Sequence, residues 1–155
     1  MMSAQTFSTT NSDQTLSAQV APQSPVARPA RWAIWTGRIL SALAVLFLLF
    51  DVTIKLLVHP MAVAGTVDLG YPADSVFLVG VLGAVCLLLY VIPQTTILGA
   101  VLWTGYLGGA IATHVRVGNP LFSHVLFPVY VALFIWGGVW LRDQQLRALF
   151  PVRRR

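Results

Sequence analysis

The segment Leu43-Ala-Val-Leu-Phe-Leu-Leu-Phe50 consists of apolar residues only and shows no alternation of polar and apolar positions. It lies within a longer run, Ile39–Val58, which is about long enough for a helix to cross a hydrocarbon core ~30 Å thick. Because lipid offers the backbone no hydrogen-bond partners, a spanning segment must be a helix or a strand of a closed barrel, and a barrel strand alternates. The segment therefore predicts a transmembrane helix.

Further apolar runs of similar length follow at Ser75–Ile92, Thr96–Thr113 and Val125–Leu141. Hydrophobic residues make up 57% of the chain and charged residues 10%, against about 25% charged in soluble domains. We therefore expect an all-α protein, an integral membrane four-helix bundle with a disordered N-terminal tail. The expected organisation is a disordered cytoplasmic tail at 1–32, a four-helix transmembrane domain at 33–145 and a basic cytoplasmic tail at 146–155.

Most of the basic residues lie near the two ends of the apolar region. Three arginines precede the first run and five follow the last: Arg28, Arg31, Arg38, Arg142, Arg147 and Arg153–Arg155. Because cytoplasmic segments carry an excess of Lys and Arg, this distribution predicts that both termini are cytoplasmic and that the chain is multi-pass. The arginines form no single patch, so we expect the lipid bilayer as a partner and no nucleic acid.

Small residues repeat along the third apolar run, where they predict close helix packing. Such residues let helix backbones approach each other in lipid, where no hydrophobic force drives association. We interpret this stripe as an intramolecular contact of a central helix, with a homodimer face as the alternative and the oligomeric state left open. The stripe consists of Ala100, Thr104, Gly105, Gly108, Gly109 and Ala112.

Polar residues are predicted to gather in one layer of the membrane. Asp51 and Lys55 interrupt the first run four residues apart, so they share a helix face. At ~1.5 Å per residue they lie ~18 and ~24 Å from the start of that run, in the outer half of the bilayer. His114, Arg116 and His124 lie at helix ends on the same side. The layer is either a local Asp51–Lys55 ion pair or a ligand site shared by several helices.

The histidines do not form a recognisable metal site. His114 and His124 are ten residues apart across a turn, and no carboxylate completes a zinc or iron ligand set of known spacing. We expect no metal, and this spacing disfavours a haem. Histidines beside a carboxylate would suit proton exchange with the headgroup of a quinone.

Several motifs closely resemble the DoxX-like family of small bacterial four-helix membrane proteins. The resemblance extends over residues 37–150. An asparagine stands at position 119, where an acidic residue would be expected from the family. The motifs are Asp51–Lys55, Leu69–Pro72, Thr104–Gly118, Asn119–His124 and Phe127–Tyr130.

The resemblance implies a location in the bacterial cytoplasmic (inner) membrane. It also implies a link to quinone-coupled redox complexes, but it supplies no agreed catalytic residues. We therefore expect an accessory component of a membrane redox or quinone-linked complex, with possible redox-complex subunits as partners. The alternative is an oxidoreductase subunit that binds a quinone or another small molecule at its own polar site. Whether the chain is an enzyme stays open, and a transporter is disfavoured because no inverted repeat is apparent.

Overall fold

The computed structural model describes residues 31–149, which form helices joined by short turns. The prediction of an all-α chain is confirmed over this range. The first helix already begins at Arg31, so the last two residues of the expected tail at 1–32 are helical. The rest of that tail and residues 150–155 of the basic tail lie outside the described residues.

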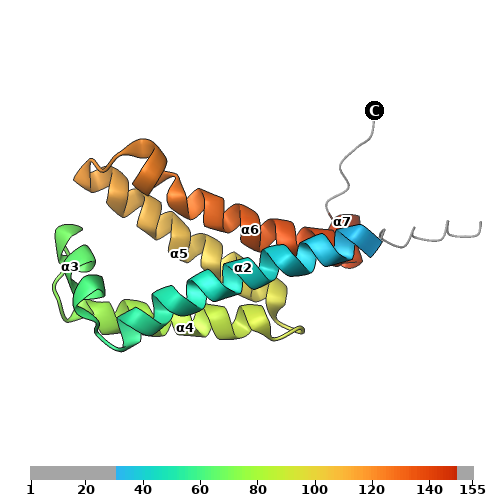
Figure 1. The fold of residues 1–155 in the computed structure, drawn as a ribbon, viewed down its shortest axis with the longest axis horizontal. Helices are drawn as coiled ribbons and strands as arrows, with labels where there is room; N and C mark the ends of the chain where they lie inside the picture. The colour runs from blue at the N-terminus through green and yellow to red at the C-terminus, as the bar shows by residue number, and fades with distance from the viewer. Residues whose placement is uncertain (1–30, 150–155) are drawn as a thin grey trace, which may run out of the picture.

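Four longer helices and three short ones make up the described chain (Figure 1). The longer helices are α2 (Arg31–Leu56), α4 (Ser75–Val91), α5 (Thr96–Val117) and α6 (Phe127–Arg142). The short ones are α3 (Pro60–Asp68), the π-helix η1 (Leu121–Val125) and α7 (Gln144–Leu149).

Three segments are long and apolar enough to span a membrane: α2, α5 and the stretch Leu121–Arg142, which comprises η1 and α6. The fourth, α4, is equally apolar but has only 17 residues, or about 25 Å of helix. The apolar runs thus predicted both ends of α4, α5 and α6 to within four residues, whereas α2 begins eight residues before its run.

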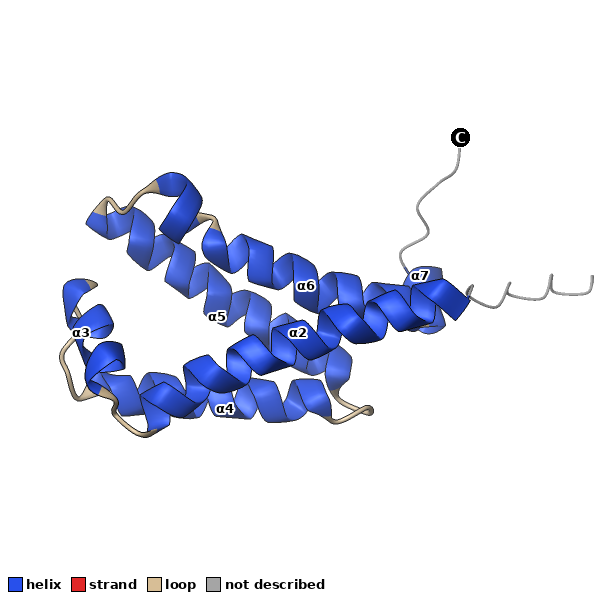
Figure 2. Cartoon of the chain, viewed as in Figure 1, coloured by secondary structure: helices blue, strands red, loops and turns tan. Residues whose placement is uncertain are grey.

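The four longer helices pack in a ring in which α2 and α5 each contact both α4 and α6. The loops and turns that join the helices are drawn in tan in Figure 2. The largest fully buried side chains include Leu48, Tyr90, Trp103 and Ile135. Many large apolar side chains on the outer faces are exposed, as expected for helices solvated by lipid. The short helix α3 packs on α2 and α4, whereas η1 packs on α5 and α6.

Glycines mark the places where these helices approach each other most closely. A Cβ on Gly138 of α6 would collide with Ser41 Oγ and lie 2.9 Å from the Ser41 backbone nitrogen of α2. On α4, a Cβ on Gly80 would lie 2.9 Å from Lys55 Cβ. Gly99 of α5 similarly lies against the backbone of Tyr90. Close backbone packing therefore occurs at every contact around the ring except that between α5 and α6.

The prediction that the stripe on α5 is an intramolecular contact is wrong for most of its residues, whereas the alternative of a homodimer face stays a prediction. Ala100 is fully buried, but Thr104, Gly105, Gly108, Gly109 and Ala112 are exposed. A Cβ on Gly105, Gly108 or Gly109 would meet no described atom within 4 Å. The physical reason is the helical period, because a four-residue repeat turns by ~40° more than one full turn at each step. Over the stripe this drift reaches ~120°, so one end is buried and the other faces outward.

A π-helical turn, η1, lies between α5 and α6. The amide of Leu126 donates to Leu121 O at 2.8 Å, which closes the wider π-type turn. The turn ends at Leu126, and Pro128 occupies the first turn of α6, where its missing N–H costs no hydrogen bond. His124 is thereby placed on a local structure separate from both long helices.

The glycine contacts give a matched test of the packing. Gly138→Ala should lower the free energy of unfolding by about 1–3 kcal/mol, because its methyl group collides with Ser41. Gly108→Ala should be neutral or stabilising by up to ~1 kcal/mol, since alanine favours a helix and meets nothing there. Thermal melting of both variants in the same detergent measures the difference. Equal melting temperatures would contradict the proposed α2–α6 contact.

Candidate functional site

An ion pair on α2 is the centre of the polar layer. Lys55 Nζ lies 2.5 Å from Asp51 Oδ2, as the four-residue spacing predicts. The same ammonium donates a hydrogen bond to the hydroxyl of Tyr106 on α5 at 3.2 Å. It also lies 5.7 Å from the centroid of the Tyr106 ring. The pair is therefore not purely local, because it connects α2 with α5, whose backbones are not neighbours in the ring.

Two histidines lie together at the same end of the molecule. The rings of His114 and His124 are 5.7 Å apart in an edge-to-face arrangement. His114 Nδ1 lies 2.9 Å from Nδ2, the side-chain amide nitrogen of Asn119. Because that amide nitrogen is a donor, the neutral His114 ring accepts at Nδ1 and carries its proton at Nε2. His124 Nδ1 is bonded to Ser123 Oγ at 2.8 Å.

Arg116 has a different position from the one predicted. It donates to Leu69 O at 2.5 Å, and its guanidinium lies 5.8 Å from the ring centroid of Tyr71. The hydroxyl of Tyr71 is in turn hydrogen-bonded to Thr113 Oγ1, with 3.0 Å between the two oxygens. Gly70 adopts φ +81, and a Cβ there would lie 3.2 Å from the guanidinium, which explains glycine at this turn. Arg116 therefore holds the 69–72 turn against α5 and lies apart from the other residues of the polar layer.

Two adjoining cavities open beside the ion pair. The larger, of about 440 Å³, lies among α2, α4, α5 and α6, and most of its lining is apolar. The smaller, of about 390 Å³, lies between the polar layer and α3. The residues that line both are Asp51, Lys55, Thr66, Leu69 and His114.

The larger cavity is amphipathic. Its apolar lining includes Phe47 and Phe127, whose rings are 5.2 Å apart in an edge-to-face pair between α2 and α6. Its polar lining includes Tyr106 and Thr113 of α5 together with the ion pair. The arrangement can hold an elongated molecule with a polar group at the ion pair and an apolar body against hydrocarbon walls.

The structure thus brings four of the five predicted site residues to shared cavities and leaves Arg116 apart. Asp51, Lys55, His114 and His124 line the smaller cavity, and all of them except His124 also line the larger one. The sequence prediction missed Trp103, Tyr106 and Thr113. A signal for these did exist, because positions 103, 106, 110 and 113 repeat at helical spacing and share one face. Among residues 31–149, no group of three His, Cys, Asp or Glu side chains is placed to hold a metal.

These features define a helical membrane protein with an amphipathic cavity that ends in a partly buried ion pair. A family model described as the DoxX-like family matches residues 39–138, and the chain belongs to this family. All the residues that line the two cavities fall within the matched region. No curated protein and no solved structure matches the chain at a significant level.

The ion pair can be tested by comparing single and double substitutions. Lys55→Met leaves the partly buried Asp51 carboxylate without its cation, and we expect a loss of about 3 kcal/mol of unfolding free energy. Adding Asp51→Asn removes the unpaired charge and should recover most of that loss. The measurement is a double-mutant cycle, in which the wild type, both single variants and the double variant are melted thermally in the same detergent. A double variant as unstable as Lys55→Met would contradict charge pairing as the cause.

Proposed function

We propose that this membrane protein binds a neutral amphipathic ligand of the quinone type. The ring of the ligand would lie at Lys55 and Tyr106, and its tail would lie along the apolar wall. The observation that carries the proposal is the larger cavity, which joins an extended apolar lining to a partly buried ion pair. An ionisable pair within a membrane helix is costly, and by default it indicates a functional site.

The charge of the site favours a neutral headgroup. Asp51 and Lys55 together carry no net charge and lie 2.5 Å apart. A carboxylate or phosphate added beside them would leave one negative charge uncompensated in a low-dielectric setting, which is costly. A neutral carbonyl group adds no charge and accepts a hydrogen bond from the ammonium. The site is therefore better suited to a quinone-like ring than to a fatty acid or a lipid phosphate.

The second part of the proposal concerns the context of the ligand. We infer that the chain is an accessory component of a membrane redox complex, in which it holds the quinone for a partner subunit. Membership of the DoxX-like family supports this role, as does a site that offers hydrogen-bonding groups and a hydrocarbon cavity. An oxidoreductase subunit that reacts with the quinone itself would use the same site, so the partners distinguish the two roles.

A copurification experiment tests both parts. The protein is extracted from native membranes into polymer nanodiscs, and its quinone content is measured by mass spectrometry relative to the bulk membrane. We expect quinone enrichment for the wild type and at least tenfold less for Asp51→Asn with Lys55→Met, since a charge-assisted hydrogen bond is worth about 1.5–3 kcal/mol. Leu133→Ala is the control because Leu133 is exposed and lies outside both cavities.

Each outcome of that experiment has a defined meaning. A wild type whose quinone content equals that of the bulk membrane overturns the ligand proposal. Redox-active subunits that copurify with the wild type support the accessory role. Quinone enrichment together with quinone reduction by the isolated chain favours the oxidoreductase role instead.

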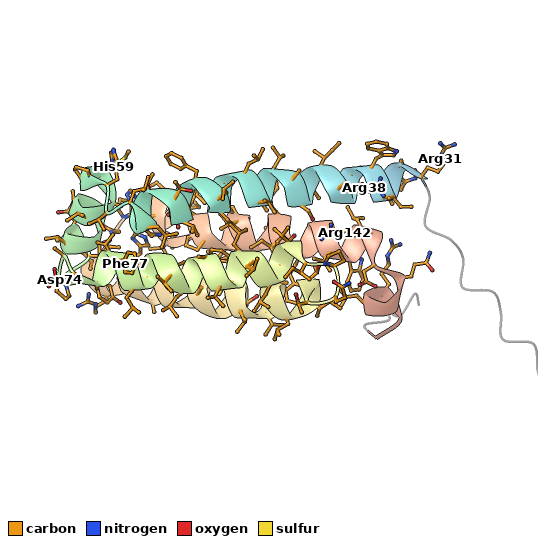
Figure 3. The ribbon with its side chains drawn as sticks, turned by 90° about the horizontal axis from the view of Figure 1, so that it is seen from below. Arg31, Arg38, His59, Asp74, Phe77 and Arg142 are labelled. Carbon is orange, nitrogen blue, oxygen red and sulfur yellow. The ribbon has the colours of Figure 1, made fainter. Side chains whose placement is uncertain are left out.

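The location proposed is the bacterial cytoplasmic membrane, with all four longer helices crossing it. Arg31, Arg38 and Arg142 lie at one end of the molecule, whereas His59 and Asp74 lie at the other (Figure 3). The positive-inside rule favours a cytoplasmic location for the arginine end. Local thinning of the bilayer would accommodate the short helix α4 at a modest cost.

Reporter fusions test this topology. A fusion after Arg147 should report the cytoplasm and one near Asp68 should report the outside, because the arginine end is retained inside. The measurement uses a paired reporter, one enzyme active only in the cytoplasm and one active only outside. The same compartment for both fusion sites would contradict the proposed crossings, and exchanged compartments would contradict the orientation.

A further inference from the structure

The larger cavity reaches the outer surface of the bundle at a glycine. Gly109 of α5 lines that cavity and is also exposed. A Cβ at this position would meet no described atom within 4 Å, so helix packing does not require a glycine here. By contrast, a Cβ on Gly83, which is buried on α4, would lie 3.0 Å from Val52 Cγ2. The glycine at position 109 therefore leaves open space at the edge of the cavity.

The position of Gly109 on α5 puts this space next to the polar end of the site. Residues three and four apart are neighbours on a helix surface, so Gly109 lies beside both Tyr106 and Thr113. The Tyr106 hydroxyl accepts a hydrogen bond from Lys55 Nζ at 3.2 Å. The hydroxyls of Thr113 and Tyr71 are hydrogen-bonded, which ties the 69–72 turn to α5 about one helical turn beyond Gly109. Bare backbone thus borders the cavity between the partner of the ion pair and this turn.

The exposed residues in the lining of the larger cavity show where it meets the lipid. Apart from Tyr71 in the outer turn, they are Phe47, Leu82, Gly109 and Phe127. Phe47 and Phe127 come from α2 and α6, and their ring centroids lie 5.2 Å apart in the edge-to-face pair. These two rings therefore cover the cavity on the side of α2 and α6.

The side of α4 and α5 is less covered. Leu82 of α4 is two residues from Gly80, which lies against Lys55 of α2, and two residues turn a helix by ~200°. Leu82 is therefore directed away from α2, and its side chain is 52% exposed. Gly109 of α5 has no side chain with which to meet it. The cavity is accordingly more open to lipid on the side of α4 and α5.

We propose that the ligand enters the larger cavity from the lipid, between α4 and α5, by passing Gly109. The inference rests on the proposed function and adds the source of the ligand. The ring of the bound ligand lies at Lys55 and Tyr106, and its tail leaves the cavity through this opening. The ligand is thus a membrane-dissolved molecule with a long apolar tail, rather than a solute taken from water. Because the end of the tail lies in lipid, the volume of the cavity sets no limit on its length.

Two neighbouring glycines give a matched test of this route. Gly108 and Gly109 are both exposed, and a Cβ on either would meet no described atom within 4 Å. Of the two, only Gly109 lines a cavity, so Gly108→Phe is the control for Gly109→Phe. The probe is decylubiquinone in nanodiscs, and its dissociation constant is measured by calorimetry as a mole fraction in the bilayer. Thermal melting of both variants shows whether they are equally folded.

We expect Gly109→Phe to bind decylubiquinone about tenfold more weakly than the wild type, because its ring would overlap the tail of the ligand. Gly108→Phe should bind as the wild type does. Gly109→Ala should also match the wild type, since a methyl group meets nothing there.

A second measurement uses the wild type alone, so it does not depend on the folding of a variant. Decylubiquinone that carries a photoreactive diazirine midway along its tail is bound in nanodiscs and irradiated. Mass spectrometry then locates the cross-links. We expect them at Leu82 of α4 and at the residues of α5 around Gly109, where the tail leaves the cavity.

The outcomes separate this inference from the proposed function. Cross-links confined to Phe47 and Phe127 overturn the route between α4 and α5, whatever the variants bind, and leave the quinone site standing. Wild-type affinity in Gly109→Phe overturns the route as well, as does an equal loss of affinity in Gly108→Phe, which would show a general effect of bulk on α5. A wild type that binds no decylubiquinone overturns both the route and the proposed function.

Discussion

Hydrocarbon supplies no hydrogen-bond partners, and the rest of this structure follows from that constraint. Each backbone group in the membrane must be paired within the chain, so the apolar runs form helices. The same constraint applies to side chains, which explains why Thr53, Thr104 and Thr113 bond carbonyls four residues earlier in their own helices. The same constraint makes the ion pair on α2 notable, because it lies beside a cavity in which most of the lining is apolar.

The helices themselves were predictable because spanning length and composition are local properties. Packing was not, because it depends on which face of each helix meets a neighbour. The small residues of α5 suggested a contact that the rotation of the helix places outside the ring. The real contacts use single glycines, such as Gly99 of α5 against Tyr90 and Gly138 of α6 against Ser41. A single glycine in an apolar run carries no periodic signal, so the sequence could not identify these contacts.

The site was partly predictable for a related reason. Charged residues in apolar runs are conspicuous, and Asp51, Lys55, His114 and His124 do share a cavity. Arg116 was assigned to the same layer by depth alone, but its side chain is directed to the Leu69 carbonyl. Trp103 was missed because an aromatic residue in a membrane helix is ordinary in sequence. Only its place in the lining of the larger cavity distinguishes it, and that depends on how the helices pack against each other.

The π-helical turn of η1 has a consequence for how this architecture tolerates insertions and deletions. A π turn accommodates one more residue than an α turn over the same rise. Removing one residue between Leu121 and Val125 would let the turn close as an ordinary α-helix. Because the π turn absorbs the extra residue locally, the segments on either side would keep nearly their present angular register. A deletion of one residue within α6 would instead rotate everything before it by ~100° relative to the rest of that helix. The π turn is therefore the place at which this part of the bundle tolerates a change in chain length.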